Sequence, residues 1–443
     1  MAQREYNFDG LVGPTHNYAG LSRGNLASAA HEGQVSSPLK AALQGLEKMR
    51  FVASLGVGQA VLPPQPRPSL RTLRALGFAG SDEAVVRRAA AEAEQLLRLV
   101  SSAASMWTAN AATSAPSEDT ADGRMHLTPA NLQAMFHRAI EADTTYSVLS
   151  RIFADAQAFC VHAPLPGGIH FADEGAANHT RLRVEGRPSV HLFAWGRSSA
   201  HSSPLPVRFP ARQTLEASEA LARLHQLEPA QCLFPQQAPS GIDAGAFHTD
   251  VLAVGNEGFL MLHALAFQDA PGLLSTLRAR LGPAFRVVQA SEAELPVADA
   301  VAAYPFNSQV LSLPNGSMCI LAPKESQERP RARAFLERVV QEDNPVVAVH
   351  YLDVRESMNN GGGPACLRQR IRLTDAERKK VTARVFYDEA LHRDLEAWVR
   401  RHYRDRLAPE DLRDPALARE GMAALDALTG LLALGSVYDF QKP

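Results

Sequence analysis

The chain has 443 residues, of which 46% are hydrophobic and 21% charged, and its formal net charge is −2. This composition is typical of a globular protein and gives no overall positive field that would attract nucleic acid or an anionic membrane. No segment approaches 18 consecutive apolar residues, and the N-terminus MAQREYNFDG lacks the apolar core of a signal peptide. The four cysteines form no C-x-x-C pair, which favours reduced thiols and a cytoplasmic protein.

Helical and strand-like patterns alternate along the chain up to about residue 374, and the remainder is mainly helical. The first helix is expected over 36–56, with a serine cap, Pro38 in the first turn and Gly56 at its end. Further helices are expected over 81–104, 128–142, 211–228 and 328–342. Strands are expected within 189–196, 251–267, 285–291 and 345–354, and a hairpin over 309–323 should turn at Asn315-Gly316. The pattern predicts an α/β fold without a low-complexity linker.

Short polar turns built from small residues recur along the chain, centred on Asn110, Asn178, His248, Asn307 and Asn360. Their spacings of 68, 70, 59 and 53 residues suit one supersecondary unit that is repeated about five times, with its turns converging on one centre. Asparagine and small residues are common in any turn, so the recurrence alone leaves this reading open.

A glycine-rich turn precedes Cys366 in the stretch SMNNGGGPACLRQRIRL, residues 357–373. The alternation that follows predicts a strand beginning at the cysteine, which would share one face with Arg368, Arg370 and Arg372. These cations would favour the thiolate and lower the thiol pKa, and the glycines would let the backbone approach a substrate closely. The alternative is a buried structural cysteine beside a solvated arginine face. The other cysteines lie in apolar runs and are expected in the core: Cys160, Cys232 and Cys319.

Two further segments carry groups suited to acid–base or cation-binding chemistry. In GIDAGAFHTDVLAVG, His248 and Asp250 lie two residues apart at the start of a predicted strand, so their side chains should point the same way. Histidine is the usual general acid or base near neutral pH, and a carboxylate can orient it or bind a cation beside it. A purely structural pair fits this stretch equally well. In GGIHFADEGAANHTRL, residues 167–182, a carboxylate could face a cationic substrate.

Two other patterns are considered and rejected. His170, Glu174 and His179 could bind a metal, but the spacings of the zinc motifs are absent, so no metal is expected. GLSRG over 20–24 matches the G-x-S-x-G pattern of a serine nucleophile, yet no strand-like segment precedes Ser22. A glycine-bounded loop that closes over a ligand explains this stretch better. No Walker loop or dinucleotide fingerprint occurs, and no cofactor is expected.

Four segments together resemble the N-succinylarginine dihydrolase family: GLVGPTHNYAGLSRGNLAS, FADEGAANHTRL, AGAFHTDVLAVGN and MNNGGGPACLRQR. The resemblance covers nearly the whole chain. It implies one catalytic domain over 1–443 with the pentein fold of guanidine-modifying enzymes, a five-bladed α/β propeller of ββαβ units, and a mainly helical segment from about 375. It also implies a homodimer whose small-molecule substrate is N2-succinylarginine, in arginine catabolism by the arginine succinyltransferase pathway.

The same resemblance implies roles for particular residues. Cys366 would be the nucleophile, His248 the general acid and base, and Glu174 the third catalytic residue. Of the adjacent Asn359 and Asn360, the second is chosen as a substrate contact because it directly precedes the glycines. All the implied substrate contacts are Ala19, Gly20, Leu21, Ser22, Arg23, Gly24, Asn25, Leu26, Ala27, Ser28, Asn110, His137, Arg138, Arg212, Asp250 and Asn360.

These residue types suit the chemistry of a guanidinium group, which is a planar cation and a poor electrophile. A thiolate provides the strong nucleophile, carboxylates can hold the planar N–H groups, and a histidine can protonate departing ammonia and then activate water. Two such cycles would give N2-succinylornithine, two ammonia and carbon dioxide. The alternatives are an arginine deiminase or amidinotransferase of the same superfamily, or a non-catalytic pentein-like binding protein.

Overall fold

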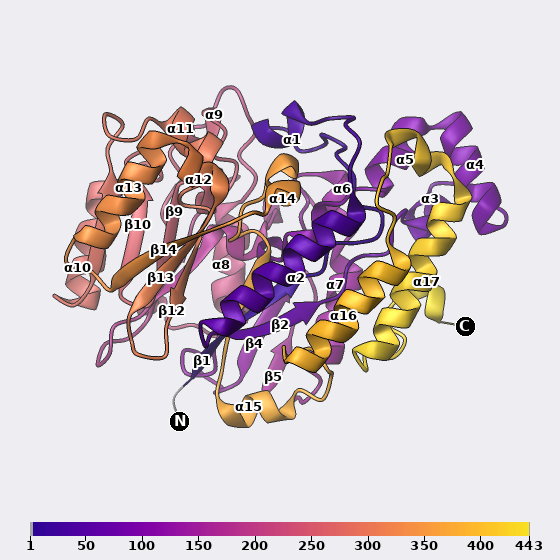
Figure 1. Ribbon diagram of the computed structural model, residues 1–443. Helices are drawn as coiled ribbons and strands as arrows, with labels where there is room; N and C mark the ends of the chain where they lie inside the picture. The colour runs from indigo at the N-terminus through magenta and orange to yellow at the C-terminus, as the bar shows by residue number, and fades with distance from the viewer. Residues whose placement is uncertain (1–2, 443) are drawn as a thin grey trace.

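A computed structural model describes residues 3–442 (Figure 1). Within this range the strands form five sheets of three strands each. In strand order, the sheets are β15 (Arg368–Leu373), β1 (Arg4–Gly10) and β2 (Gly58–Leu62); β3 (Ala112–Ala115), β4 (Met125–Pro129) and β5 (Phe159–Val161); β6 (His179–Leu182), β7 (Val190–Phe193) and β8 (Cys232–Leu233); β9 (Ala253–Asn256), β10 (Phe259–His263) and β11 (Arg286–Ala290); and β12 (Gln309–Ser312), β13 (Met318–Pro323) and β14 (Val346–Leu352).

All five sheets share one pattern, in which the middle strand pairs antiparallel with the first strand and parallel with the third. In four sheets the three strands follow one another along the chain. In the fifth, β15 from late in the chain pairs with β1, so both ends of the sheet-forming region contribute to one unit. The prediction of an α/β fold from a repeated unit is confirmed. The like sheets are compatible with a five-bladed propeller, whose closure stays a prediction.

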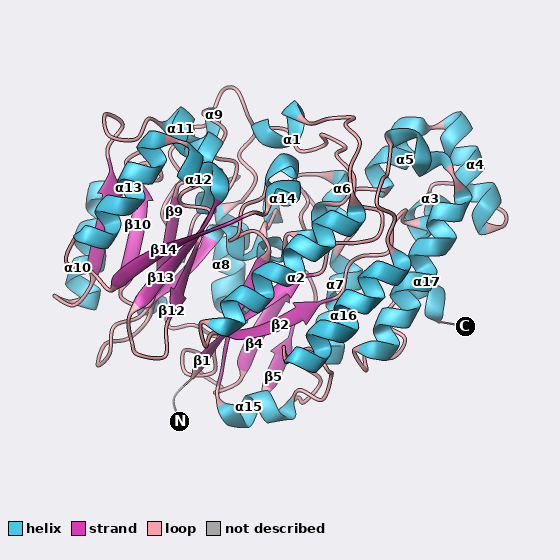
Figure 2. Cartoon of the chain, in the orientation of Figure 1, coloured by secondary structure: helices cyan, strands magenta, loops and turns pink. Residues whose placement is uncertain are grey.

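Helices connect the parallel strands of each unit, as a parallel pair requires a crossover. Between β1 and β2 lies α2 (Pro38–Ser54), and between β4 and β5 lie α6 (Phe136–Ala139) and α7 (Ala142–Ile152). Between β7 and β8 lies α8 (Leu215–Leu224), and between β10 and β11 lies α10 (Ala270–Leu281). Between β13 and β14 lie α12 (Lys324–Glu328) and α13 (Pro330–Gln341). Figure 2 shows these helices around the strands. The other helices are α1 (Leu26–Ala30), α3 (Leu70–Ala75), α4 (Asp82–Glu92), α5 (Glu94–Val100), α9 (Pro239–Asp243), α11 (Val297–Ala303), α14 (Arg355–Asn360), α15 (Asp375–Lys380), α16 (Glu389–His402) and α17 (Pro415–Leu431).

The segment after β15 is mainly helical, as predicted. Helices α16 and α17, yellow in Figure 1, pack against one another, and α16 also packs against α2. Buried leucine, valine and aromatic side chains from these helices join the large core that runs under the sheets. No helix among residues 3–442 is long and apolar enough to cross a membrane.

Local sequence signals placed several elements correctly. The Ser37 side chain accepts a hydrogen bond from the Lys40 N–H (3.2 Å) and caps α2, and Gly56 follows the helix with φ 79°. The hairpin of β12 and β13 turns at the predicted Asn315-Gly316, where Gly316 has φ 86°.

Two predicted helices are wrong in extent. The segment 81–104 is broken at Ala93 into α4 and α5. The segment 128–142 begins inside β4, because Thr128 and Pro129 extend that strand beside β3, and only the four residues of α6 and the start of α7 are helical. Tertiary pairing overrides the amphipathic pattern there.

Candidate active site

The five turns predicted to converge lie just before the first strands of the five sheets. Asn110 precedes β3, Asn178 precedes β6, His248 precedes β9, Asn307 precedes β12 and Asn360 precedes β15. Hydrogen bonds join several of these turns: the Asn110 side chain donates to the Glu174 carbonyl (2.7 Å), and Asn178 Oδ1 accepts from the Thr249 N–H (2.8 Å). The repeat therefore places the polar residues of these five turns at the same end of their sheets, before the first strand of each.

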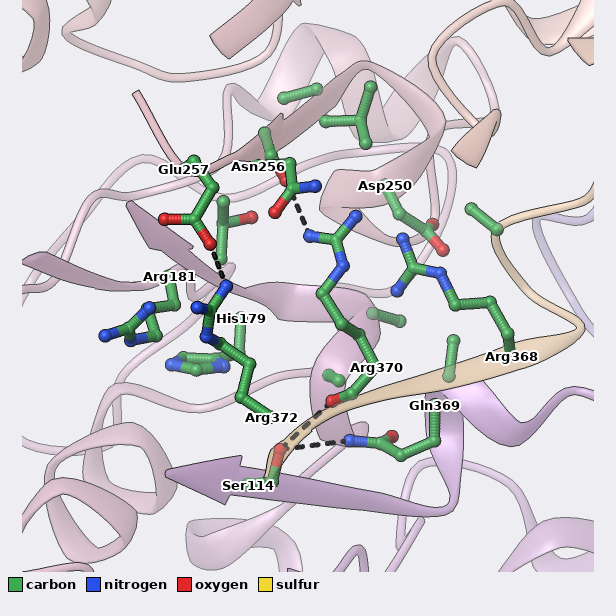
Figure 3. Close-up of a pocket in the computed structure, with 18 of the residues that line it drawn as sticks. Ser114, His179, Arg181, Asp250, Asn256, Glu257, Arg368, Gln369, Arg370 and Arg372 are labelled. Carbon is green, nitrogen blue, oxygen red and sulfur yellow. Dashed lines mark hydrogen bonds and ion pairs between the residues drawn. The ribbon is translucent and has the colours of Figure 1, made fainter. Parts of the chain in front are cut away.

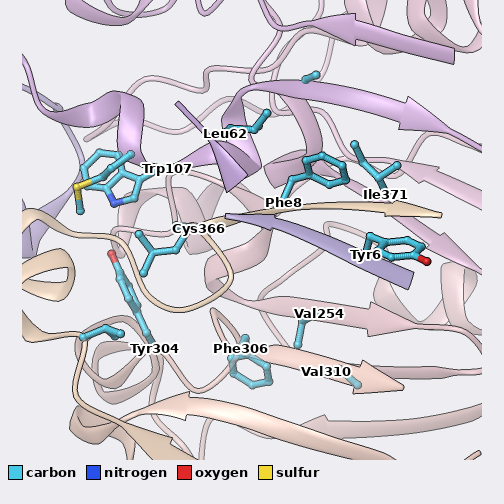
Figure 4. Packing of buried hydrophobic residues seen from close by; sticks show 14 of the residues in the cluster. Tyr6, Phe8, Leu62, Trp107, Val254, Tyr304, Phe306, Val310, Cys366 and Ile371 are labelled. Atoms are coloured by element: carbon cyan, nitrogen blue, oxygen red, sulfur yellow. The ribbon is translucent and has the colours of Figure 1, made fainter. Parts of the chain in front are cut away.

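Cys366 lies in a turn rather than at the start of a strand, which corrects the sequence expectation. Its N–H donates to the Gly363 carbonyl (3.1 Å), its carbonyl accepts from the Ala109 N–H (3.1 Å), and β15 begins only at Arg368. The side chain is 3% exposed and lies among apolar neighbours that include Trp107 and Tyr304 (Figure 4). The thiol is therefore held in a largely dry position at the entry to the strand.

The three glycines before Cys366 are required by the protein's own packing. Gly361 has φ 93° at the end of α14, and a Cβ there would overlap the Asn25 side chain. A Cβ on Gly362 would overlap the Trp107 indole, and one on Gly363 would lie 2.7 Å from the Asn307 carbonyl oxygen. The glycines are therefore needed for packing within the chain, while close approach of a substrate to their backbone stays a prediction.

His248 and Glu174 form a buried pair. His248 Nε2 lies 2.7 Å from Glu174 Oε2, and the two side chains are 1% and 2% exposed. The Glu174 N–H donates to Gln213 Oε1 (2.7 Å), which fixes the glutamate backbone. Because the carboxylate accepts the Nε2 proton, the lone pair of a neutral ring is on Nδ1. Nδ1 has no hydrogen-bond partner among the described residues.

Charge and burial set the protonation of this pair. Burial alone would raise the pKa of Glu174, but the hydrogen bond from His248 and the positive charges of Arg212 and Arg138 lower it to about 2. Burial lowers the pKa of His248 to about 4, and Glu174 offsets only part of that effect. At neutral pH the pair is therefore a carboxylate beside a neutral imidazole, which is ready to accept a proton.

Asp250 faces Cys366 instead of His248. His248 directly precedes a 3-10 turn over Thr249–Val251 and Asp250 lies within it, so neither residue is at the start of a strand, and the strand alternation behind their predicted common direction does not apply. Asp250 Oδ2 lies 3.6 Å from Cys366 Sγ. Burial and the Asp250 charge raise the pKa of the thiol well above its ordinary value, and burial raises the pKa of Asp250 to about 7. The predicted lowering of the thiol pKa by arginines is therefore wrong for the free protein.

The arginines of β15 do share one face, but that face lines a separate cavity (Figure 3). The cavity measures about 90 Å³, and Arg368, Arg370 and Arg372 border it together with Asp250 and Glu257. Arg368 points toward Asp250 in Figure 3, and its charge opposes the rise in the pKa of that carboxyl group. Asp250 thus lies between the arginines and the thiol.

Several predicted contact residues lie close to the His248–Glu174 pair. Arg212 Nη1 is 4.0 Å from Glu174 Oε2, Arg212 Nη2 donates to the Arg23 carbonyl (2.9 Å), and the guanidinium lies over the Phe247 ring. Arg138 Nη1 donates to Asn110 Oδ1 (3.3 Å). Both guanidinium groups are buried, and their positive charges act on Glu174 and His248.

The predicted loop over 19–28 lies against the Cys366 turn. Asn25 caps α1 and donates from Nδ2 to the Gly361 carbonyl (3.1 Å). Ser22 Oγ lies 3.4 Å from His137 Nε2, and Asn360 donates to the Asn17 carbonyl (2.9 Å). Within this loop Gly20 and Gly24 have positive φ, and Arg23 and Leu26 are exposed. The structure thus assembles the predicted loop, His137 and Asn360 at one place, while their contacts with a substrate stay predictions.

The rejected metal trio is not assembled. His170 is exposed, His179 is paired with His191, and Glu174 is paired with His248.

Comparison with known proteins identifies the family of the chain. The succinylarginine dihydrolase family matches residues 2–441. An N-succinylarginine dihydrolase of Myxococcus xanthus is 72% identical over 439 residues, covering 99% of this chain and all of the relative. One from Nitrosospira multiformis is 53% identical over 447 residues, with both chains covered completely. The chain belongs to the succinylarginine dihydrolase family.

A solved structure outside the succinylarginine dihydrolase family has the same fold. The N-terminal domain of ArgZ, an arginine dihydrolase from the ornithine–ammonia cycle in cyanobacteria, aligns with 84% of this chain and 98% of its own length. The TM-score is 0.51 at 14% sequence identity, so this likeness concerns the fold alone.

Two residues beside the site in this member of the succinylarginine dihydrolase family were given no functional role from the sequence. Gln213 supports Glu174, and the Asn307 carbonyl accepts the Ala365 N–H (3.1 Å) beside the thiol. Asn307 could have been found, since it occupies the fourth position of the repeat. Gln213 carries no signal beyond its place next to Arg212.

Proposed function

We propose that the protein hydrolyses N2-succinyl-L-arginine with two waters to N2-succinyl-L-ornithine, two ammonia and carbon dioxide, in arginine catabolism. The observation that carries the proposal is the full-length match to the dihydrolase family, with a cysteine, a histidine–glutamate pair and a second carboxylate buried at the matching motifs. We assign Cys366 as the nucleophile, His248 as general acid and base, and Glu174 as the residue that orients His248.

Buried polar atoms without partners support a ligand site here. Of the buried atoms without partners among the described residues, five belong to predicted site residues: His248 Nδ1, Asp250 Oδ1, Arg212 Nε, and Arg138 Nε and Nη2. Buried polar groups are nearly always hydrogen-bonded in native proteins, so a cluster of exceptions calls for missing partners. A substrate with a guanidinium at one end and two carboxylates at the other supplies both kinds of partner.

Substrate binding would ionise the nucleophile. In the free protein the thiol donates toward the Asp250 carboxylate, and its pKa is raised. A bound guanidinium would donate its N–H groups to Asp250 and Glu174, neutralise their charge, and place a cation beside the sulfur. The thiol proton can then pass to neutral His248, whose Nδ1 is free to accept it.

The reaction would then proceed in two cycles of attack on the substrate carbon. The thiolate adds to the guanidinium carbon, a C–N bond breaks, and the proton on His248 leaves with ammonia. Neutral His248 takes one proton from water as the resulting hydroxide adds to the carbon. The C–S bond then breaks to restore the thiolate, and in the first cycle the remaining hydroxyl proton, which carried the guanidinium charge, leaves with the ammonia as ammonium. The first cycle leaves a ureido group, and the second releases another ammonia and leaves a carbamate that loses carbon dioxide.

The neutral ureido intermediate needs a second means of retention, and Arg138 suits it best. Nε and Nη2 form one edge of the guanidinium, and both are free, so this edge can hold a carboxylate through two parallel hydrogen bonds. Glu141 Oε2 lies 4.0 Å from Nε, too far for a hydrogen bond. Arg212 also contacts Glu174, so it would act on both binding and catalysis.

Entry of a substrate requires a movement of the chain, because Cys366, His248 and Glu174 are each at most 3% exposed. We assign this movement to the loop over 19–28, which is attached to the Cys366 turn through Asn25 and Gly361. Positive φ at Gly20 and Gly24 marks two positions at which the backbone can pivot.

The test is product analysis with N2-succinylarginine and with free arginine as separate substrates, following ammonia and product mass. The proposal requires two ammonia per succinylornithine and little turnover of free arginine. One ammonia per substrate would identify a deiminase, transfer of the amidino group without ammonia an amidinotransferase, and binding without turnover a binding protein.

Membership of the succinylarginine dihydrolase family also supports a proposal about the domain structure, assembly and location of the protein. We assign the chain to a single catalytic domain that forms a homodimer in the cytoplasm. Sedimentation equilibrium on the purified chain measures the assembly directly, and a monomer at micromolar concentration would contradict the dimer.

A further inference from the structure

A cluster of histidine and cysteine side chains lies on the sheet of β3, β4 and β5, apart from the active-site residues. His126 on β4 pairs in register with Cys160 on β5, and His162 follows directly after β5. His126 Nδ1 lies 3.0 Å from His162 Nε2, and Cys160 Sγ lies 3.6 Å from the same Nε2. These three atoms lie within 4.8 Å of one another.

The separations suit a tetrahedral ion. A zinc ion about 2.05 Å from nitrogen and about 2.3 Å from sulfur sets nitrogen–nitrogen edges of about 3.3 Å and nitrogen–sulfur edges of about 3.6 Å. The observed 3.0 and 3.6 Å are within a few tenths of an ångström of these values. The three groups can therefore reach one ion with only small side-chain shifts.

The surroundings of His126 point to a cation at Nδ1. The ring is fully buried, Nε2 lies 3.0 Å from Asp122 Oδ1, and Nδ1 lies 3.1 Å from the Leu224 carbonyl oxygen. Both neighbours are acceptors, and a neutral ring can donate to only one of them. When Nε2 donates to Asp122, the Nδ1 lone pair faces the Leu224 carbonyl oxygen, and the group that satisfies it is either the His162 Nε2–H or a cation in its place. A carboxylate that fixes a histidine in this way is the usual second partner of a metal-bound imidazole.

A fourth group lies nearby. His225 is fully buried, its ring centroid is 5.7 Å from that of His162, and its Nδ1 has no hydrogen-bond partner among the described residues. Cys160 and His162 are only half-buried, so an ion can enter from solvent.

We propose that His126 Nδ1, His162 Nε2 and Cys160 Sγ form a binding site for a divalent zinc-type ion, with the fourth position open to water or to His225. Binding releases the Cys160 thiol proton to solvent and moves the His162 ring proton from Nε2 to Nδ1. The site shares no residue with the proposed catalytic machinery, and the ion would link β4, β5 and the loop after β5. The inference does not depend on the proposed function.

The test uses cobalt(II) as a spectroscopic probe and zinc(II) as its competitor. The full chain carries Cys366→Ser, so that the active-site thiol cannot bind the metal, and is first freed of metal with a chelator. We expect one equivalent of cobalt, with a sulfur-to-cobalt charge-transfer band and the intense visible bands of a four-coordinate ion. One equivalent of zinc should remove these bands.

Variants then assign the ligands. Adding Cys160→Ser should abolish the charge-transfer band and weaken zinc binding at least tenfold, and His162→Gln should weaken it similarly. The matched control is Cys232→Ser, another cysteine on a neighbouring sheet, which should leave the spectrum unchanged. Cys160→Ser alone, with Cys366 intact, should retain wild-type turnover, which shows that the fold is preserved.

Absence of a charge-transfer band in the Cys366→Ser protein would overturn the proposal, and the contact between His126 Nδ1 and His162 Nε2 would then be an ordinary hydrogen bond. A band that persists after Cys160→Ser would overturn it as well.

Discussion

Replacing Asp250 by asparagine should make the Cys366 thiol more acidic while making the enzyme slower. Asp250 Oδ2 lies 3.6 Å from Sγ, and the carboxyl group, with a pKa of about 7, is ionised whenever the thiol titrates. Two unit charges at this separation repel by about 4.6 kcal/mol at an effective dielectric constant of about 20. Asp250→Asn removes this repulsion, so the pKa of the Cys366 thiol should fall toward its ordinary value.

Turnover should change in the opposite direction. The amide cannot accept guanidinium N–H groups as a carboxylate does, and loss of a charge-assisted contact costs about 1.5–3 kcal/mol, so kcat/KM should fall by about 10- to 150-fold. The assay is the pH dependence of iodoacetamide alkylation, with the Cys366 peptide quantified by mass spectrometry, alongside steady-state kinetics. Asp173→Asn is the matched control, because Asp173 is a buried carboxyl group that contacts Gln213 and Gly175. An alkylation midpoint that stays in place or rises in Asp250→Asn would refute the electrostatic reasoning.

Three further outcomes are expected. Cys366→Ser should bind N2-succinylarginine in calorimetry but turn it over at least a thousandfold more slowly, since a hydroxyl forms no comparable anion at neutral pH; activity within tenfold of wild type would exclude the assigned nucleophile. Arg138→Lys keeps the charge but loses the two-bond edge, so KM should rise about 10- to 150-fold and free succinylcitrulline should appear in the medium by mass spectrometry; unchanged products would show that Arg138 does not retain the intermediate. Gly362→Ala should lower the free energy of unfolding by about 1–3 kcal/mol in urea titrations, because the added Cβ overlaps Trp107. Gly430→Ala should raise it by about 0.5–1 kcal/mol, because Gly430 lies within α17 and an added Cβ there meets no atom within 4 Å. Equal effects of the two glycine substitutions would contradict the packing explanation.

Signals that act within a few residues were readable from the sequence. Ser37 and Gly56 mark the ends of α2, Asn315-Gly316 marks a hairpin, and each of the five recurring turns precedes the first strand of a sheet. The sequence could not reveal where tertiary contacts end a helix or extend a strand against the local amphipathic pattern. The break at Ala93 carries neither glycine nor proline, and β4 extends into an apparent helix because a neighbouring strand pairs with it.

The electrostatics of the site depend on long-range contacts and were misjudged for that reason. The spacing of Arg368, Arg370 and Arg372 correctly predicts that they share a face. It does not show that Cys366 precedes the strand in a turn, or that Asp250, 116 residues earlier, is the charge that faces the thiol. The same holds for the histidine–cysteine cluster, since His126 and Cys160 become neighbours only through the parallel pairing of β4 and β5.

Interception of the covalent adduct tests the central claim most directly. Protein mixed with N2-succinylarginine and quenched in acid within one turnover should carry, on the peptide containing Cys366, the mass of the substrate less one ammonia. The Cys366→Ser protein treated in the same way should carry none. Turnover to succinylornithine without any adduct in this experiment, or an adduct on Cys160, Cys232 or Cys319 instead, would contradict the assignment of Cys366 as the nucleophile.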